Sequence, residues 1–121
     1  MVVVPEFLLR RIYQKGSLKK LEDGASVTLK NVLGPGFISG FNYVKINDVI
    51  FEAKDVKFIT NGQEVLGTEV SEANPVAFRL GQSGTLIMQG QACVIDGVNK
   101  IEIGAMNPEA GKVQLKAEDV A

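Results

Sequence analysis

Turn-forming residues interrupt this chain about every ten positions, and this spacing limits what it can fold into. The signals are Gly16, Asp23-Gly24, Gly34-Pro35-Gly36, Asn47-Asp48, Asn61-Gly62, Asn74-Pro75, Gly81 to Gly84, Asp96-Gly97 and Asn107-Pro108. Glycine and asparagine accept positive φ, Asx side chains bond their own backbone, and proline fixes φ. Intervals of roughly 7 to 14 residues accommodate strands, but not helices of three turns or more. The spacing therefore predicts many short β-strands.

The segments between these signals show the alternation of half-buried strands. Apolar and polar residues alternate over residues 25–30, 56–58, 100–103 and 112–117. A period of two places one face of each strand against a core and leaves the other in water. Residues 85–88 form a short apolar run that is typical of a buried strand. Single helical turns are expected at most, at residues 52–57 and 66–73.

The Asn61-Gly62 dipeptide is the strongest short-range hairpin signal in the chain. A type I′ turn needs two residues of positive φ, which these two tolerate. The turn would place Thr60 opposite Gln63 and Phe58 opposite Val65. With the other strands, it predicts an all-β, antiparallel β-sandwich of about eight or nine short strands. We expect one such domain over residues 1–121, with a barrel as the alternative.

Composition removes several function classes. The 121 residues contain no histidine, so no Ser-His-Asp arrangement exists within this chain. A net charge of −1 without a clustered basic face argues against nucleic acid and against a membrane surface as partners. No apolar run approaches a membrane span, and Met1 to Glu6 lack the basic start of a signal peptide. We therefore expect a cytoplasmic protein.

Potential nucleophiles and metal ligands are few. The single cysteine, Cys93, lies in an apolar stretch and is expected to be a buried hydrophobe. The adjacent pairs Glu22-Asp23 and Glu118-Asp119 would point to opposite faces of a strand and so rarely chelate together. We predict no catalytic residue, no metal site and no cofactor on this chain. A hydrolase or isomerase that uses two of its carboxylates is a further hypothesis.

Two segments are candidates for a partner interface or for shaping a pocket. The first is the loop Gly34, Pro35, Gly36 and Phe37, which is either a plain turn or a rigid loop that presents Pro35 and Phe37. The second contains Asn74, Pro75, Phe78 and Arg79. Phe78 is either a core residue of an ordinary loop or part of a contact loop. In the second case Arg79 would be available for a carboxylate across an interface.

The order of these landmarks resembles a known family. The relevant segments, over about residues 8–117, are LRRIYQKGSLK at 9–19, EDGASVTLKN at 22–31, LGPGFISG at 33–40, SEANPVAF at 71–78 and GVNKIEI at 97–103. Together they look like the small β-subunit of bacterial C-glycoside deglycosidases. Members of that family often have a histidine near the closing strand, where this chain has Asn99 or Lys100.

The resemblance implies a function. Those enzymes cleave the carbon–carbon bond between a sugar and an aromatic aglycone, commonly a flavonoid, by β-elimination from a 3-oxo-glycoside. The resemblance implies that a metal-bearing α-subunit of the sugar-phosphate-isomerase barrel type supplies the base and a divalent metal, expected to be manganese. This chain would be its auxiliary subunit in a lyase complex, inactive alone, with the substrate near the interface. The alternative is a stand-alone carbohydrate-binding or structural β-sandwich, although the chain has no Trp platform.

Overall fold

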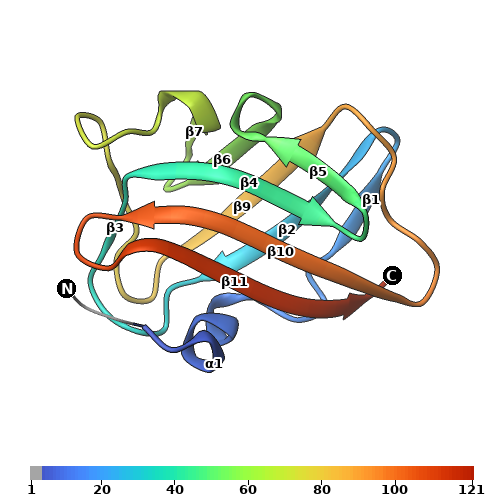
Figure 1. Cartoon of the computed structure of the whole chain (residues 1–121), viewed down its shortest axis with the longest axis horizontal. Coiled ribbons are helices and arrows are strands. Elements are labelled where there is room, and N and C mark those ends of the chain that lie inside the picture. The colour runs from blue at the N-terminus through green and yellow to red at the C-terminus, as the bar shows by residue number, and fades with distance from the viewer. Residues whose placement is uncertain (1–3) are drawn as a thin grey trace.

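The computed structural model describes residues 4–121 and confirms an all-β, antiparallel fold. Residues 1–3, part of the stretch that argued against a signal peptide, lie outside the described residues. Two sheets pack face to face, with β4, β10 and β11 in front of β2, β6 and β9 in the view of Figure 1. The described residues contain eleven strands, more than the eight or nine expected, because the count includes the two-residue strands β3 and β8.

The first sheet has five strands in the order β1-β2-β9-β6-β7. Their bounds are Lys19–Leu21, Gly24–Lys30, Ser83–Gln89, Val56–Thr60 and Gln63–Leu66. The β6–β7 hairpin has the predicted register, with Thr60 opposite Gln63 and Phe58 opposite Val65. Asn61 and Gly62 at its tip have φ values of 52° and 73°, as a type I′ turn requires.

The second sheet has four strands in the order β11-β10-β4-β5. Their bounds are Gly111–Val120, Val98–Asn107, Gly40–Ile46 and Val49–Glu52. The two longest strands, β10 and β11, form a hairpin that pairs from Asn107 opposite Gly111 to Val98 opposite Val120. A separate pair, β3 (Phe37–Ile38) and β8 (Val76–Ala77), closes one end of the sandwich.

From residue 4 onward, helical structure is confined to short turns. The 3₁₀ turns η2 (Ala53–Asp55) and η3 (Gly67–Glu69) fall within the segments where single turns were expected. The α-helical turn α1 (Glu6–Leu9) and the 3₁₀ turn η1 (Arg10–Ile12) were not predicted. They lie along β11 and contain no buried residue. With 4 and 3 residues, each is too short for a helical pattern of apolar residues to show in the sequence. Within residues 4–121, no helix is long and apolar enough to cross a membrane.

The core lies between the two sheets and is built from alternate residues of each strand. Val27 of β2, Leu86 of β9 and Val56 of β6 are fully buried on the inner face of the first sheet. They face Val44 of β4 and Ile101 of β10 from the second sheet, which are also buried. The alternation seen in the sequence therefore corresponds to a real two-layer core.

Candidate functional site

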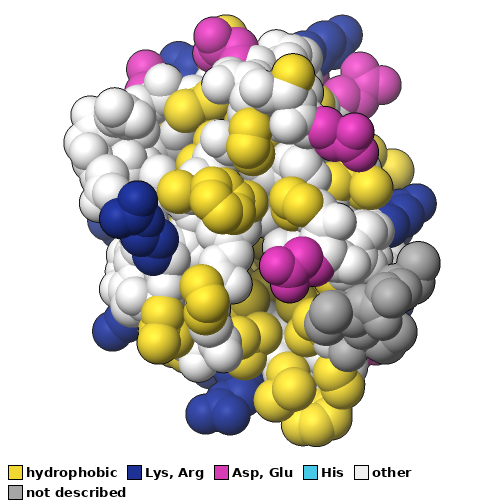
Figure 2. All heavy atoms as spheres, turned by 90° about the vertical axis from the view of Figure 1, so that its left-hand side faces the viewer, with side chains coloured by type: hydrophobic (Ala, Val, Ile, Leu, Met, Phe, Trp, Pro, Cys, Tyr) yellow, Lys and Arg dark blue, Asp and Glu magenta, His cyan; other side chains and the backbone are white. Residues whose placement is uncertain are grey.

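An apolar groove opens at the end of the sandwich that carries β3, beside the β10–β11 turn. It has a volume of about 340 Å³ and is lined mainly by aliphatic and aromatic side chains. Its walls come from the start of the described chain, from residues 31–38, from Phe78 and from residues 103–115. Figure 2 shows this end of the molecule, where hydrophobic side chains gather around a hollow. A concave apolar surface of this size is the usual form of a binding site.

The floor and the rim of the groove differ in exposure. Phe41 and Phe78 line the floor and are 5% and 6% exposed, as part of the core. Leu33 and Phe37 stand on the rim and are 38% and 50% exposed. The groove thus joins buried aromatic rings to large apolar side chains that remain in contact with water, a combination that is typical of interaction surfaces.

Asn31 holds the rim in place. Its buried side-chain amide donates to the carbonyl oxygens of Gly34 and Phe78, both at 2.6 Å. The amide oxygen accepts from the N–H groups of Leu33 and Gly34, at 3.1 and 3.3 Å. One side chain therefore fixes the 34–37 loop and joins it to the loop that contains Phe78, so the groove has a rigid entrance.

Replacing Asn31 with alanine should loosen this entrance. The buried carbonyl of Phe78 would lose its donor, and we expect the free energy of unfolding to fall by about 2 kcal/mol. Hydrogen exchange at Leu33 and Gly34 should accelerate. Urea denaturation and exchange mass spectrometry measure both effects. Asn42→Ala, at an exposed position in β4, is the control; equal losses in the two variants would contradict this role for Asn31.

The small sheet β3–β8 and Asn107 complete the rim. The side-chain amide of Asn107 donates to the Phe37 carbonyl at 2.9 Å, and its oxygen accepts from the N–H groups of Glu109 and Ala110. The N–H of Phe78 donates to the Gly36 carbonyl at 3.0 Å. The turn signal Asn107-Pro108 in the sequence thus also organises the site.

The structure brings only some of the predicted interface residues together. Those that line the groove are Gly34, Pro35, Gly36, Phe37 and Phe78. The others, Asn74, Pro75 and Arg79, are exposed and are not part of its lining. Asn74 instead closes a local turn, since its N–H donates to Ser71 and its side chain donates to the Glu69 carbonyl. The plain-loop interpretation fits this turn, and it also fits the buried ring of Phe78.

Most residues of the groove gave no signal in the sequence. Leu9, Ile12, Phe41, Met106 and Val113 contribute to its walls from three separate parts of the chain. These are ordinary apolar residues, and only the folded arrangement of α1, η1, β4, β10 and β11 places them beside the 34–37 loop. Asn31 had a weak signal, because an asparagine side chain often bonds the backbone two residues further on, as Asn31 does with the N–H of Leu33.

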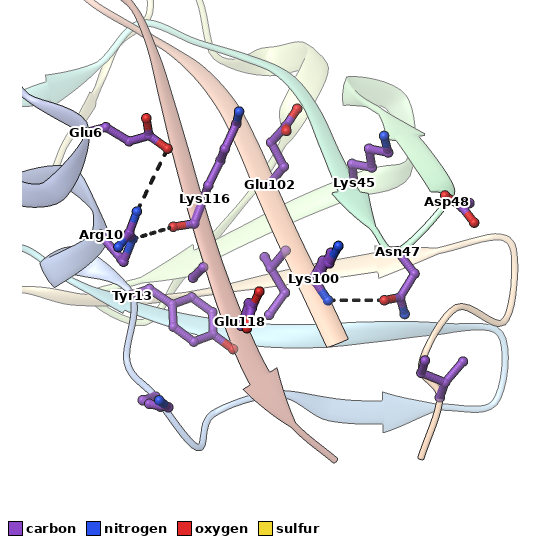
Figure 3. A pocket seen from close by; sticks show the side chains of 14 residues that line it. Glu6, Arg10, Tyr13, Lys45, Asn47, Asp48, Lys100, Glu102, Lys116 and Glu118 are labelled. Atoms are coloured by element: carbon purple, nitrogen blue, oxygen red, sulfur yellow. Dashed lines mark hydrogen bonds and ion pairs between the residues drawn. The ribbon is translucent and has the colours of Figure 1, made fainter. Parts of the chain in front are cut away.

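A second hollow lies on the outer face of the second sheet. It has a volume of about 1000 Å³ and is lined by five cationic and four anionic side chains, which are Arg10, Lys15, Lys45, Lys100, Lys116, Glu6, Asp48, Glu102 and Glu118. Figure 3 shows the charged side chains of three neighbouring strands, which are Lys45 of β4, Lys100 and Glu102 of β10, and Lys116 and Glu118 of β11. Glu102 is paired in register with both Lys45 and Lys116, so opposite charges alternate across the sheet. This charge balance is typical of a solvated sheet face.

A buried carboxylate joins β11 to the segment between η1 and β1. Asp119 of β11 is 3% exposed and accepts the Tyr13 hydroxyl at 2.6 Å. It also accepts the N–H groups of Gly16 and Leu18. Burial raises the pKa of Asp119, but these donors lower it more, and the net pKa lies below the ordinary value. Burial and the bond to Asp119 raise the pKa of the Tyr13 phenol.

Asn99, where the C-glycoside deglycosidase subunits often have a histidine, has a structural role. Asn99 is fully buried, and its side chain bonds the backbone of Ile95 and Gly97. Asn47 donates to the Asn99 side chain at 2.9 Å and to the Cys93 carbonyl at 2.8 Å. The two asparagines therefore fold residues 93–97 back onto the sheet. Cys93 is buried as predicted, and burial raises the pKa of its thiol.

Metal-ligating side chains do not gather in the described part of the chain: residues 4–121 contain no group of three or more Cys, Asp or Glu that could hold an ion. Of the pair Glu118-Asp119, the first side chain is exposed and the second is buried, as their alternation along β11 predicted. The expectation that this chain binds no cofactor remains a prediction.

The fold and the groove together define the chain as an antiparallel β-sandwich with an apolar groove at one end. The chain belongs to the family described as the hydroxymethylglutaryl-CoA reductase N-terminal domain, whose model matches residues 8–121. No curated protein sequence gives a match to this chain.

This family match corrects the resemblance to the small β-subunit of C-glycoside deglycosidases, which is wrong. The expected role as an auxiliary subunit of a carbon–carbon lyase is overturned with it. So are the 3-oxo-glycoside substrate and the α-subunit of the isomerase-barrel type. The alternative of a carbohydrate-binding or structural module receives no specific support.

The physical reason lies in the residues that produced the resemblance. Segments 33–40 and 71–78 are turns that serve the fold through Asn31 and the β3–β8 pair. Segment 97–103 contains Asn99, which clamps its own loop. Turn residues in a given order describe an antiparallel architecture, and such an architecture hosts unrelated functions.

Proposed function

We propose that this chain is a non-catalytic binding domain of a protein related to hydroxymethylglutaryl-CoA reductase. In this proposal the domain docks through its apolar groove onto the catalytic part of the enzyme. Family membership over residues 8–121 supports the reductase relationship. The groove, with the exposed rim residues Leu33 and Phe37, is the observation that supports docking.

Energetic considerations favour a docking role for the rim. Burying apolar surface contributes roughly 25 cal/mol per Å², so a half-exposed phenylalanine beside an apolar groove is a potential interface anchor. The loop that carries Phe37 is already fixed by Asn31 and Asn107. A pre-ordered surface loses little conformational entropy when it binds, which favours affinity.

Two expectations from the sequence remain part of this proposal. The domain is expected to hold no cofactor of its own, so that the reacting groups belong to the catalytic part. It is also expected to act in the cytoplasm. The present site residues would then contribute adhesion and shape rather than chemistry.

The test is a binding measurement between this chain and the separately produced catalytic region of the hydroxymethylglutaryl-CoA reductase from the same organism. We expect a complex by calorimetry, and Phe37→Asp should weaken it by roughly 30-fold, as for an anchor of about 2 kcal/mol. The charge would have to be buried against apolar walls. Reduction of hydroxymethylglutaryl-CoA should be measured with and without the domain.

Ile50→Asp is the matched control, because Ile50 is 62% exposed on β5 and does not line the groove. Thermal melts of both variants establish that the fold is intact. If the unmodified chain forms no complex with the catalytic region, the proposed function is wrong. If Ile50→Asp weakens the complex as much as Phe37→Asp, the groove is not the docking surface.

A further inference from the structure

Among the described residues that line the groove, one carboxylate lies at its mouth. Glu109 lies in the β10–β11 turn and is the charged residue among those that line the groove. It is exposed, and its N–H donates to the Asn107 side chain at 2.9 Å, which fixes its backbone. Among residues 4–121, no cation lies within 4.0 Å of its carboxylate. An apolar hollow with a single negative charge at its edge favours an apolar ligand that carries a positive charge.

The main-chain groups of the rim loops argue for the conformation of that ligand. The carbonyls of Gly34 and Phe78 accept from Asn31, that of Phe37 accepts from Asn107, and that of Gly36 accepts from the N–H of Phe78. The other sheet edge at the groove is β11, which contributes Val113 and Leu115 to the lining and is flanked by α1 and η1. An extended segment that adds to a sheet needs free carbonyl and N–H groups at the edge. A helix satisfies its own backbone and needs only apolar contact, so these occupied carbonyls favour a helix.

We infer that the groove takes an amphipathic helix whose apolar face enters between Leu33 and Phe37 and whose flank carries a Lys or Arg that meets Glu109. This inference rests on the proposed function, since it describes the segment of the catalytic part that would dock. Such helices present apolar residues at positions i, i+3, i+4 and i+7. The basic residue orients the helix, while the apolar face contributes most of the affinity.

Two synthetic peptides test the inference without the reductase. Each has about 20 residues, which is long enough to be helical, with leucines at the spacing just described. They differ at one flanking position, which is lysine in one peptide and glutamate in the other. Fluorescence polarisation should show the lysine peptide binding the full chain about fivefold more tightly, the range of exposed charge pairs. Glu109→Gln should abolish the preference, and Glu109→Lys should reverse it.

Glu118→Gln is the matched control, because Glu118 is an exposed glutamate on the far side of β11 from the groove lining. It should leave the preference unchanged. Hydrogen exchange of the wild-type complex should show protection at residues 33–38. The inference is overturned if neither peptide binds, or if the fivefold preference survives Glu109→Gln.

The two proposals fail separately. If the lysine peptide binds at residues 33–38 but the reductase catalytic region does not, the proposed function is wrong and the recognition of a cationic helix stands. If the catalytic region binds through Phe37 while Glu109→Lys leaves its affinity unchanged, the function stands and the inferred chemistry of the partner segment is wrong.

Discussion

Replacing Phe58 with alanine is expected to remove about 3–5 kcal/mol from the free energy of unfolding, a large part of the stability of a domain this size. Phe58 of β6 is fully buried, and its ring centroid lies 5.4 Å from that of Phe41 and 5.6 Å from that of Phe78. A Cβ at Gly84 would clash with the Phe58 ring, so the neighbouring strand β9 leaves room for this side chain. Urea denaturation of the wild type and the variant measures the loss.

Phe7→Ala is the control, because Phe7 is 65% exposed and its truncation should change stability by less than about 0.5 kcal/mol. Phe58→Leu should cost less than the alanine variant, since it leaves a smaller cavity. A loss below about 1 kcal/mol for Phe58→Ala would contradict the central position of this ring. The same variant should also weaken docking, because Phe78, which Phe58 supports, lines the groove.

Local features of the fold could be predicted because their causes are local. The hairpin β6–β7 follows from the tolerance of Asn61 and Gly62 for positive φ, and the register follows from the two-residue loop. The turn signals Asn47-Asp48 and Asn107-Pro108 likewise mark the hairpins β4–β5 and β10–β11. The alternation of apolar and polar residues then identified the side chains of β2 and β11 that face the core.

The arrangement of the strands could not be predicted in the same way. β9 pairs with both β2 and β6, although it follows both in the chain and is separated from β2 by more than fifty residues. Nothing within a single strand specifies a distant partner, because the choice depends on how all the apolar faces are buried together. The pairing of β4 with β10, a strand far along the chain, could not be predicted for the same reason.

The groove was predictable only where a turn forms part of it. The loop at Gly34 to Phe37 was identified from its glycines and its aromatic residue, and it does line the site. Glu109 gave no signal in the sequence, since an acidic residue after Asn107-Pro108 reads as a solvated turn. Glu109 belongs to the candidate site only because folding brings the apolar walls from β4 and β10 close to it.

Asp119 is the residue whose replacement should most change the pH dependence of stability. It accepts the Tyr13 hydroxyl and the N–H groups of Gly16, Leu18 and Val120, from a 3% exposed position. Burial opposes its ionisation, but these donors outweigh burial and hold its pKa below the ordinary value. Asp119→Asn removes the charge that these donors meet, and we expect a loss of about 1.5–3 kcal/mol at neutral pH.

The lowered pKa fixes the direction of the pH effect. A carboxylate whose pKa is lower in the folded than in the unfolded state stabilises the fold above the unfolded value, which is about 4. That contribution is lost as the pH falls from about 4 through the folded pKa. The difference in unfolding free energy between wild type and Asp119→Asn should therefore be constant near neutrality and shrink in acid. Denaturation series at several pH values measure it.

Tyr13 should produce the opposite edge of the profile. Burial, followed by the bond to Asp119, raises the pKa of its phenol above the unfolded value of about 10. The unfolded chain then loses the phenol proton more readily, so stability should fall as the pH rises above about 10. Tyr13→Phe should flatten this alkaline limb and also reduce the acid limb, because the Tyr13 hydroxyl comes first among the donors that lower the pKa of Asp119. Glu118→Gln, at the exposed neighbour of Asp119, should alter neither limb.

The acid limb has one outcome that would contradict the role of Asp119. If the difference in unfolding free energy between wild type and Asp119→Asn stayed constant down to pH 2, the buried carboxylate would not be the titrating group. Its bonds between β11 and the turn after η1 would then stabilise the fold without any contribution from its charge.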